Sequence, residues 1–153
     1  MVPGRLGLVL IFLSAAGWSP SVVSAQETTS AARIDIVAND YAFMPLPPRI
    51  AAGPTIFSFV NQGKVNHEMS IGRLRPGVTI DDVLKVSKEG GRLRDLVTRS
   101  VGILVAGPGK SPDGRILVDL IPGETYLLLC NFKDTPDAPT HMTLGMYKTF
   151  RPQ

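Results

Sequence analysis

The chain has 153 residues, of which 44% are hydrophobic and 19% are charged, and its formal net charge is +3 at pH 7. The lysines and arginines are scattered among carboxylates and form no run, which argues against a nucleic-acid-binding surface. A weakly basic surface of this kind favours encounters with an acidic protein partner.

The first 25 residues have the pattern of a cleaved signal peptide. Arg5 gives a positive start, residues 6–16 form an apolar run, and Val23 and Ala25 stand where a signal peptidase requires small residues. The run is shorter than the ~20 apolar residues of a membrane-spanning helix, although an uncleaved N-terminal anchor is the alternative. We expect a signal peptide over residues 1–25, a flexible linker over 26–32 and one domain over 33–153. After cleavage the protein would be periplasmic or secreted and would have no membrane span.

Short strands and turns follow one another through the rest of the chain. Alternating or apolar segments predict strands over residues 33–38, 54–60, 67–71, 102–105, 115–120, 125–130 and 142–150. Thr79 and Asp82 resemble a capping box that opens a helical insert over residues 80–86, and a second short helix is expected within residues 92–98. The pattern predicts an all-β antiparallel sandwich of seven or eight strands with a short helical insert.

Cys130 is the only cysteine, so it has no partner for an internal disulfide. A free thiol outside the cytoplasm is readily oxidised, which makes a lone cysteine unusual in an exported protein. Three interpretations remain open on this basis alone: an inert buried thiol, an intermolecular disulfide, or a thiolate with a chemical role.

Cys130 has potential metal ligands near it in the sequence. His141 and Met146 follow it in the last quarter of the chain, and His67 lies upstream at the start of a predicted strand. A thiolate with two imidazoles and a weak, distant thioether is the ligand set of a trigonal blue-copper site. Taken singly, each residue also has an ordinary explanation, since buried cysteine and methionine pack in cores and a histidine can hydrogen-bond a loop.

The segment Tyr126-Leu-Leu-Leu-Cys130, followed by His141-Met-Thr-Leu-Gly-Met146, resembles the C-terminal signature of cupredoxins. Upstream, residues 59–63 and 66–68 resemble the segment that bears the first ligand histidine of that family. The resemblance extends from about residue 34 to residue 150 and is closest to exported bacterial cupredoxin-like proteins. It implies a cupredoxin-like antiparallel Greek-key β-sandwich that binds one copper ion, cycling between Cu(II) and Cu(I), through His67, Cys130, His141 and Met146.

The segment between Cys130 and His141 departs from the family pattern. It has ten residues, Asn131 to Thr140, where cupredoxins with a well-characterised copper site have only a few. Loop closure costs only about (3/2)RT ln n, so the length alone does not forbid coordination. If the loop bulges outward, the thiolate and the imidazole meet, whereas a loop that folds under would hold His141 away from the metal.

Four further residues near the predicted ligands have expected roles. Glu68 and Asn66 are candidates to hydrogen-bond the ligands or the cysteine-bearing loop, although Glu68 could equally be an ordinary exposed carboxylate. Met69 and Met142 are out of phase with the ligands, so we expect them in the core.

The preferred function is one-electron transfer with a redox or copper-accepting protein partner outside the cytoplasm, and not catalysis. Three alternatives stay open. The same ligands could hold Cu(I) for delivery to another protein, or the fold could be a metal-free interaction domain. A cysteine-dependent acyl transferase of the sortase kind is the enzymatic alternative, but only Arg151 follows as a late cation.

Overall fold

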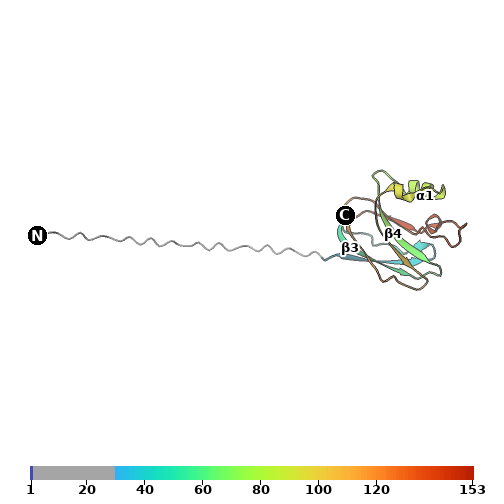
Figure 1. Ribbon diagram of the computed structural model, residues 1–153, viewed down its shortest axis with the longest axis horizontal. Helices are drawn as coiled ribbons and strands as arrows, with labels where there is room; N and C mark the ends of the chain where they lie inside the picture. The colour runs from blue at the N-terminus through green and yellow to red at the C-terminus, as the bar shows by residue number, and fades with distance from the viewer. Residues whose placement is uncertain (2–29) are drawn as a thin grey trace.

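The structure, a computed structural model, describes Met1 and residues 30–153. In the described residues, two four-stranded sheets pack face to face, and one α-helix lies outside one of them (Figure 1). The predicted signal peptide and all but the last residues of the predicted linker lie outside the described residues. In the described part of the chain, no helix has the length and apolarity needed to cross a bilayer.

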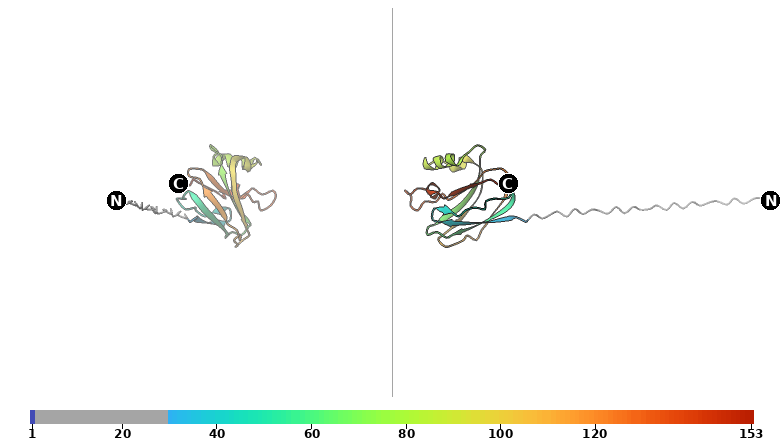
Figure 2. Two further views of the ribbon diagram at one scale, coloured as in Figure 1. Left: turned by 60° about the vertical axis from the view of Figure 1, so that its left-hand side comes forward. Right: turned by 180° about the vertical axis from the view of Figure 1, so that it is seen from behind.

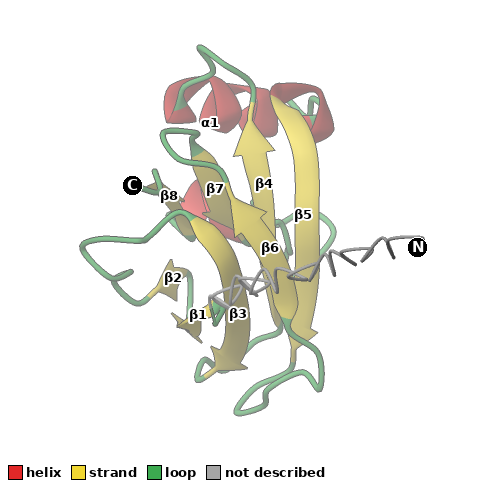
Figure 3. Cartoon of the chain, turned by 90° about the vertical axis from the view of Figure 1, so that its left-hand side faces the viewer, coloured by secondary structure: helices red, strands yellow, loops and turns green. Residues whose placement is uncertain are grey.

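The first sheet has the strand order β2-β1-β3-β6. Its strands are β1 (Ala32–Asn39), β2 (Ala42–Phe43), β3 (Gly53–Asn61) and β6 (Ile116–Leu120). The second sheet has the order β5-β4-β7-β8, with the strands labelled in Figure 3. They are β4 (His67–Leu74), β5 (Val97–Ala106), β7 (Tyr126–Leu129) and β8 (Tyr147–Phe150). The predicted all-β sandwich and the upper predicted strand count are therefore confirmed.

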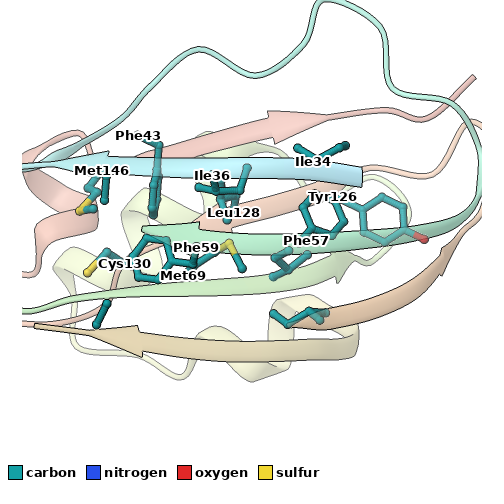
Figure 4. Packing of buried hydrophobic residues seen from close by; sticks show 14 of the residues in the cluster. Ile34, Ile36, Phe43, Phe57, Phe59, Met69, Tyr126, Leu128, Cys130 and Met146 are labelled. Atoms are coloured by element: carbon teal, nitrogen blue, oxygen red, sulfur yellow. The ribbon is translucent and has the colours of Figure 1, made fainter. Parts of the chain in front are cut away.

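The main core lies between the two sheets (Figure 4). Alternate residues of β1 and β3 point into it, among them Ile36, Phe57 and Phe59, because successive side chains of a strand face opposite sides. Met69 and Leu128 meet them from the second sheet. Burying each such side chain contributes ~1.5–3 kcal/mol, which makes this layer the main support of the fold.

Part of the second sheet, at β7, packs on its outer face as well. Helix α1 (Ile80–Lys88) begins with the predicted capping box, in which the Thr79 hydroxyl accepts from the Asp82 amide at 3.2 Å. It lies outside the sheet in every view (Figure 2) and packs Val83 in one cluster with Leu127 and Leu129. Since both faces of β7 are covered, its sequence is a continuous apolar run and does not alternate.

Three local predictions differ from the structure. β1 and β3 pair in parallel, so the first sheet is mixed and not wholly antiparallel. The second predicted helix is reduced to one 3-10 turn, η1 (Leu93–Leu96), and β5 begins directly after it. The predicted last strand is also divided, because residues 141–144 form a 3-10 turn, η2 (His141–Leu144), before β8. Gly145 ends η2 at φ +111°, a conformation that a residue with a Cβ rarely adopts.

Candidate metal centre

Three of the four predicted ligands converge at one end of the sandwich. Potential ligand atoms of His67, Cys130 and His141 lie within 4.8 Å of one another, and all three residues are buried. Cys130 Sγ is 3.3 Å from His141 Nδ1 and 3.9 Å from His67 Nδ1. The two Nδ1 atoms are 3.1 Å apart. The residues come from β4, from the residue after β7 and from η2, so the tertiary fold and not a local motif assembles the cluster.

His67 is the first residue of β4, and a tight turn before it sets its position. Asn61 at the end of β3 is fully buried, and its amide group donates to the carbonyls of Val65 at 2.8 Å and Ala106 at 3.0 Å. Its side-chain oxygen accepts from the Gly63 amide at 2.8 Å. The buried Asn61 side chain therefore holds both the turn before His67 and the end of β5, where Ala106 pairs with His67.

Cys130 lies directly after β7 with no exposed surface. Its sulfur accepts a hydrogen bond from the Glu68 amide at 3.3 Å. Burial raises the pKa of the thiol to about 11, while backbone hydrogen bonds from Glu68 and Phe132 act in the opposite direction. Those amides point at the sulfur and favour its anionic form, and a bound cation would favour it much more strongly.

The ten-residue segment between Cys130 and His141 is closed at its base by main-chain hydrogen bonds. The His141 amide donates to the Phe132 carbonyl at 2.8 Å, and the Met142 amide donates to the Cys130 carbonyl at 2.8 Å. The residues that these bonds enclose, 133–140, bulge outward at the end of the sandwich opposite the chain's C-terminus (Figure 1). The extra length is therefore accommodated outside the cluster, and the sulfur and the imidazole remain in contact.

Met146 lies at the same end of the core as Cys130 (Figure 4) and is fully buried. The Cys130 amide donates to the Met146 carbonyl at 3.1 Å, so the two residues are main-chain neighbours. Its service as an axial ligand stays a prediction. Met69 and Met142 are fully buried in two different hydrophobic clusters, in agreement with their expected place in the core.

Two carboxylates that the sequence did not single out face the outer nitrogens of the histidines. Asp40 Oδ1 is 3.4 Å from His67 Nε2, and Asp134 Oδ1 is 3.1 Å from His141 Nε2. The Lys64 amide holds Asp40 at 2.7 Å and lowers the pKa of its carboxyl. Asp134 belongs to the ten-residue loop, and its position between Cys130 and His141 was the only sequence signal for it.

Tyr41 completes the cover over His141. Its hydroxyl donates to Asp134 Oδ2 at 2.5 Å, which lowers the pKa of that carboxyl and raises the pKa of the phenol. The tyrosine ring meets the imidazole edge to face, with centroids 5.0 Å apart and planes at 75°. Tyr41 adopts φ +60°, and among the described non-glycine residues it is the only one with a positive φ. A strained backbone at this point is consistent with a residue that serves the site.

The hydrogen-bond pattern leaves lone pairs directed at the centre of the cluster. Each Nε2 faces a carboxylate, which accepts but does not donate at neutral pH, so each ring carries its hydrogen on Nε2. Both Nδ1 atoms then present lone pairs to one another and to the sulfur. The thiol hydrogen can satisfy only one of them. Because burial lowers the pKa of His67, additional protonation there is disfavoured, and the donor set suits a borderline or soft cation.

Solved structures of blue copper proteins match the described architecture. Auracyanin from Roseiflexus castenholzii superimposes at TM-score 0.56 and 20% identity over 80% of this chain and 98% of that chain. Auracyanin A, a blue copper protein from Chloroflexus aurantiacus, superimposes at TM-score 0.52 and 16% identity over 80% of this chain and 99% of that chain. An azurin from Methylomonas sp. strain J superimposes at TM-score 0.50 and 15% identity over 81% of this chain and 99% of that chain. The chain has the cupredoxin fold. No protein-family model matches the sequence, and no curated protein matches it either.

Within this cupredoxin fold, the residue after the first histidine secures the cysteine-bearing loop. Glu68 Oε1 accepts from the Asn131 amide at 2.9 Å, as the family resemblance implied. Burial raises the pKa of the Glu68 carboxyl. Asn66, the other expected neighbour, is exposed, and its side chain has no hydrogen bond to either imidazole in the described part of the chain. The side chains that hydrogen-bond the outer Nε2 atoms of the two rings are therefore Asp40 and Asp134.

Proposed function

We propose that the protein binds one copper ion through the Nδ1 atoms of His67 and His141 and the sulfur of Cys130, with Met146 as a weak thioether ligand. When bound, copper would supply a one-electron couple between Cu(II) and Cu(I). The protein would exchange single electrons with a protein partner outside the cytoplasm. The signal peptide over residues 1–25, the linker over 26–32 and the periplasmic or secreted location belong to the same proposal.

The single observation that carries this proposal is the convergence of two imidazole Nδ1 atoms and the sulfur of Cys130 within 4.8 Å in a buried cluster. A cysteine with two histidines and a weak axial methionine is typical of copper centres that transfer electrons. The chain's own residues hold this arrangement. Asp40 and Asp134 orient the rings, the Glu68 amide orients the sulfur, and Glu68 fixes the backbone after Cys130.

Preorganisation of the donors supports electron transfer over copper delivery. His67 and Cys130 are held by β4 and by the end of β7, so they need little movement between the two oxidation states of a bound copper ion. A carrier that releases Cu(I) would benefit from additional thioethers, but Met69 and Met142 lie in separate hydrophobic clusters. An acyl transferase is poorly supported as well, because Cys130 has no exposed surface and burial raises its pKa.

The test is copper loading of the chain without residues 1–25. Cu(II) should bind at one equivalent per chain and give an intense visible band from thiolate-to-copper charge transfer. Cys130→Ser should remove the band, whereas Met142→Leu, which changes a buried sulfur outside the cluster, should retain it. Zinc should compete for the site and give no colour. A folded protein that binds no copper, or binds it without the visible band, would sink the proposal.

A further inference from the structure

The imidazole of His141 is shielded from docking partners. The residue is 1% exposed, its outer nitrogen faces Asp134, and the Tyr41 ring lies against its edge. A protein that approached the centre over this histidine would contact Tyr41 and the ten-residue loop before the ring. The carboxylates of Asp40 and Asp134 would also give that face negative charge.

A cleft opens on another side of the centre, between helix α1, turn η1 and the loop that follows Cys130. Its volume is about 480 Å³, and its lining includes Arg92, Arg94, Asn131 and Lys133. A second cleft of about 280 Å³ along the outer face of β4 and β7 shares Leu93, Arg94 and Asn131 with the first. Helix α1 and the loop project toward the same end of the sandwich (Figures 1 and 2).

The charges that line the larger cleft are all positive. Arg92 is paired with Asp95 at 3.1 Å, which neutralises part of its charge. Arg94 and Lys133 have no ion-pair partner among residues 30–153. No carboxylate belongs to the lining of the larger cleft within the described part of the chain. Since the whole chain is only weakly basic, this is a local concentration of positive charge.

Asn131 connects the cleft to the candidate metal centre. It is exposed, it contributes to the lining of both clefts, and it is bonded directly to Cys130. Its amide donates to Glu68 Oε1 at 2.9 Å, which fixes the backbone at this point. A covalent path through one peptide bond therefore leads from Cys130 to the exposed Asn131, and it ends among positive charges.

We infer that this cleft is the docking surface for a redox protein that presents carboxylates around its own acceptor group. The inference rests on the proposed function and adds the partner's chemistry and the exit point. In the transfer, one electron leaves the reduced copper centre, the partner's acceptor gains it, and no proton or atom moves with it. Arg94 and Lys133 bind the partner's carboxylates, and Asn131 is the contact nearest to Cys130.

The first experiment locates anion binding on the chain without residues 1–25. The redox-inert paramagnetic trianion hexacyanochromate(III) is titrated into the isotopically labelled protein, and broadening of amide signals in two-dimensional NMR is mapped. Broadening should centre on Leu93, Arg94, Asn131 and Lys133. Broadening that centres on Asp40 and Tyr41, or that spreads over the whole surface, would overturn the inference.

The second experiment measures electron transfer from the copper-loaded, reduced protein to hexacyanoferrate(III). The double variant Arg94→Glu/Lys133→Glu should lower the second-order rate constant by ~10-fold or more at low salt, with the difference shrinking as salt rises. The control is Arg49→Glu/Arg151→Glu, which changes the net charge equally with two exposed arginines outside both clefts. Its rate should fall much less.

Each outcome bears on one proposal. Equal rate losses in the two double variants would mean that net charge alone steers the reaction, and would overturn the docking surface. The cleft could bind hexacyanochromate or phosphate while Arg94→Glu/Lys133→Glu leaves the electron-transfer rate unchanged. In that case the cleft is a small-anion site only, and the docking surface is overturned too. Failure of the protein to bind copper would refute the proposed function, and the NMR titration would still report separately on anion binding in the cleft.

Discussion

His67 and His141 present the same atom to the same point, but different parts of the fold hold them. His67 begins β4, a strand hydrogen-bonded to β5 and β7, and the buried Asn61 fixes the turn before it. His141 begins a single 3-10 turn after a ten-residue loop, and two main-chain hydrogen bonds close the base of that loop. Each ring then contacts one aspartate.

The difference separates a fixed half of the centre from an adjustable half. The sheet determines where His67 and Cys130 lie, so changes in the loop should leave them in place. The position of His141 depends on the loop, on Asp134 and on Tyr41, which the sequence supplies from segments far apart. The same substitution made at His67 and at His141, or at the aspartate beside each, should therefore change copper binding by different amounts.

The largest effect is expected from removing the rings themselves. His67→Gly and His141→Gly should each lower copper affinity by more than ~100-fold, because losing a ligand costs more than losing its outer partner. Added imidazole should restore the visible band in His141→Gly, where the loop can admit it. It should fail in His67→Gly, where the sheet and its turn enclose the space. Titration with imidazole, followed by the visible band, measures the rescue of each variant. Equal rescue of His67→Gly and His141→Gly would show that the loop side is no more adjustable than the sheet side.

Removing the charge of the outer aspartates should have the next largest effect. Asp134→Asn should lower copper affinity by ~10–100-fold, since such partners orient the ring and raise its basicity. Asp40→Asn should cost less, because its contact with the imidazole is longer, 3.4 Å against 3.1 Å. Competition against a chelator of known affinity measures both variants. A larger loss for Asp40→Asn would show that the loop side is the better fixed half.

A methyl group at residue 63 should disturb the fixed half alone. A Cβ on Gly63 would overlap Asp40 Oδ1 and lie 3.0 Å from His67 Nε2. Gly63→Ala should destabilise the protein by ~1–3 kcal/mol, the usual cost of overpacking. Gly107→Ala is the control, because the nearest atom to its Cβ would be 3.5 Å away. Thermal unfolding measures the cost, and a stability equal to that of the control would contradict the close approach of Asp40.

The smallest effect should follow loss of the cap that begins η2. The Thr140 hydroxyl accepts from the Thr143 amide at 3.4 Å, so Thr140→Ala should cost about 1 kcal/mol and speed copper release a few-fold. Thr79→Ala removes the cap of α1, at a similar cost in stability. It should leave the release rate unchanged, because α1 contributes no candidate ligand. Stopped-flow transfer of copper to a chelator compares the two.

The sequence predicted those parts of the molecule whose signals are local. The capping box at Thr79 lies within four residues, and alternation along β1 and β3 shows which side chains face the core. The ligand types His67, Cys130 and His141 could be selected because few other residues bind soft metals. Tertiary pairing was not available from such signals, so the parallel alignment of β1 with β3 was missed.

The outer partners were missed for a related reason. Aspartates such as Asp40 are common in turns, and only the folded chain brings Asp40 to His67 and Tyr41 to Asp134. The division of the predicted last strand was within reach, because Thr140 is a good N-cap and Gly145 a good terminator. The apolar run from Met142 concealed those signals, since a buried 3-10 turn and a buried strand have the same composition.

The packing of β7 on both faces has a consequence for hydrogen exchange and for metal release. Met69 and Leu128 pack against the first sheet, and Leu127 and Leu129 share a cluster with Val83 of α1, so the amides of the central strands β4 and β7 should be among the slowest to exchange with solvent. Two of the candidate ligands, His67 and Cys130, are tied to these slowest-opening strands. Copper would therefore leave through brief local openings of residues 131–141, at a rate that the overall stability of the domain does not determine.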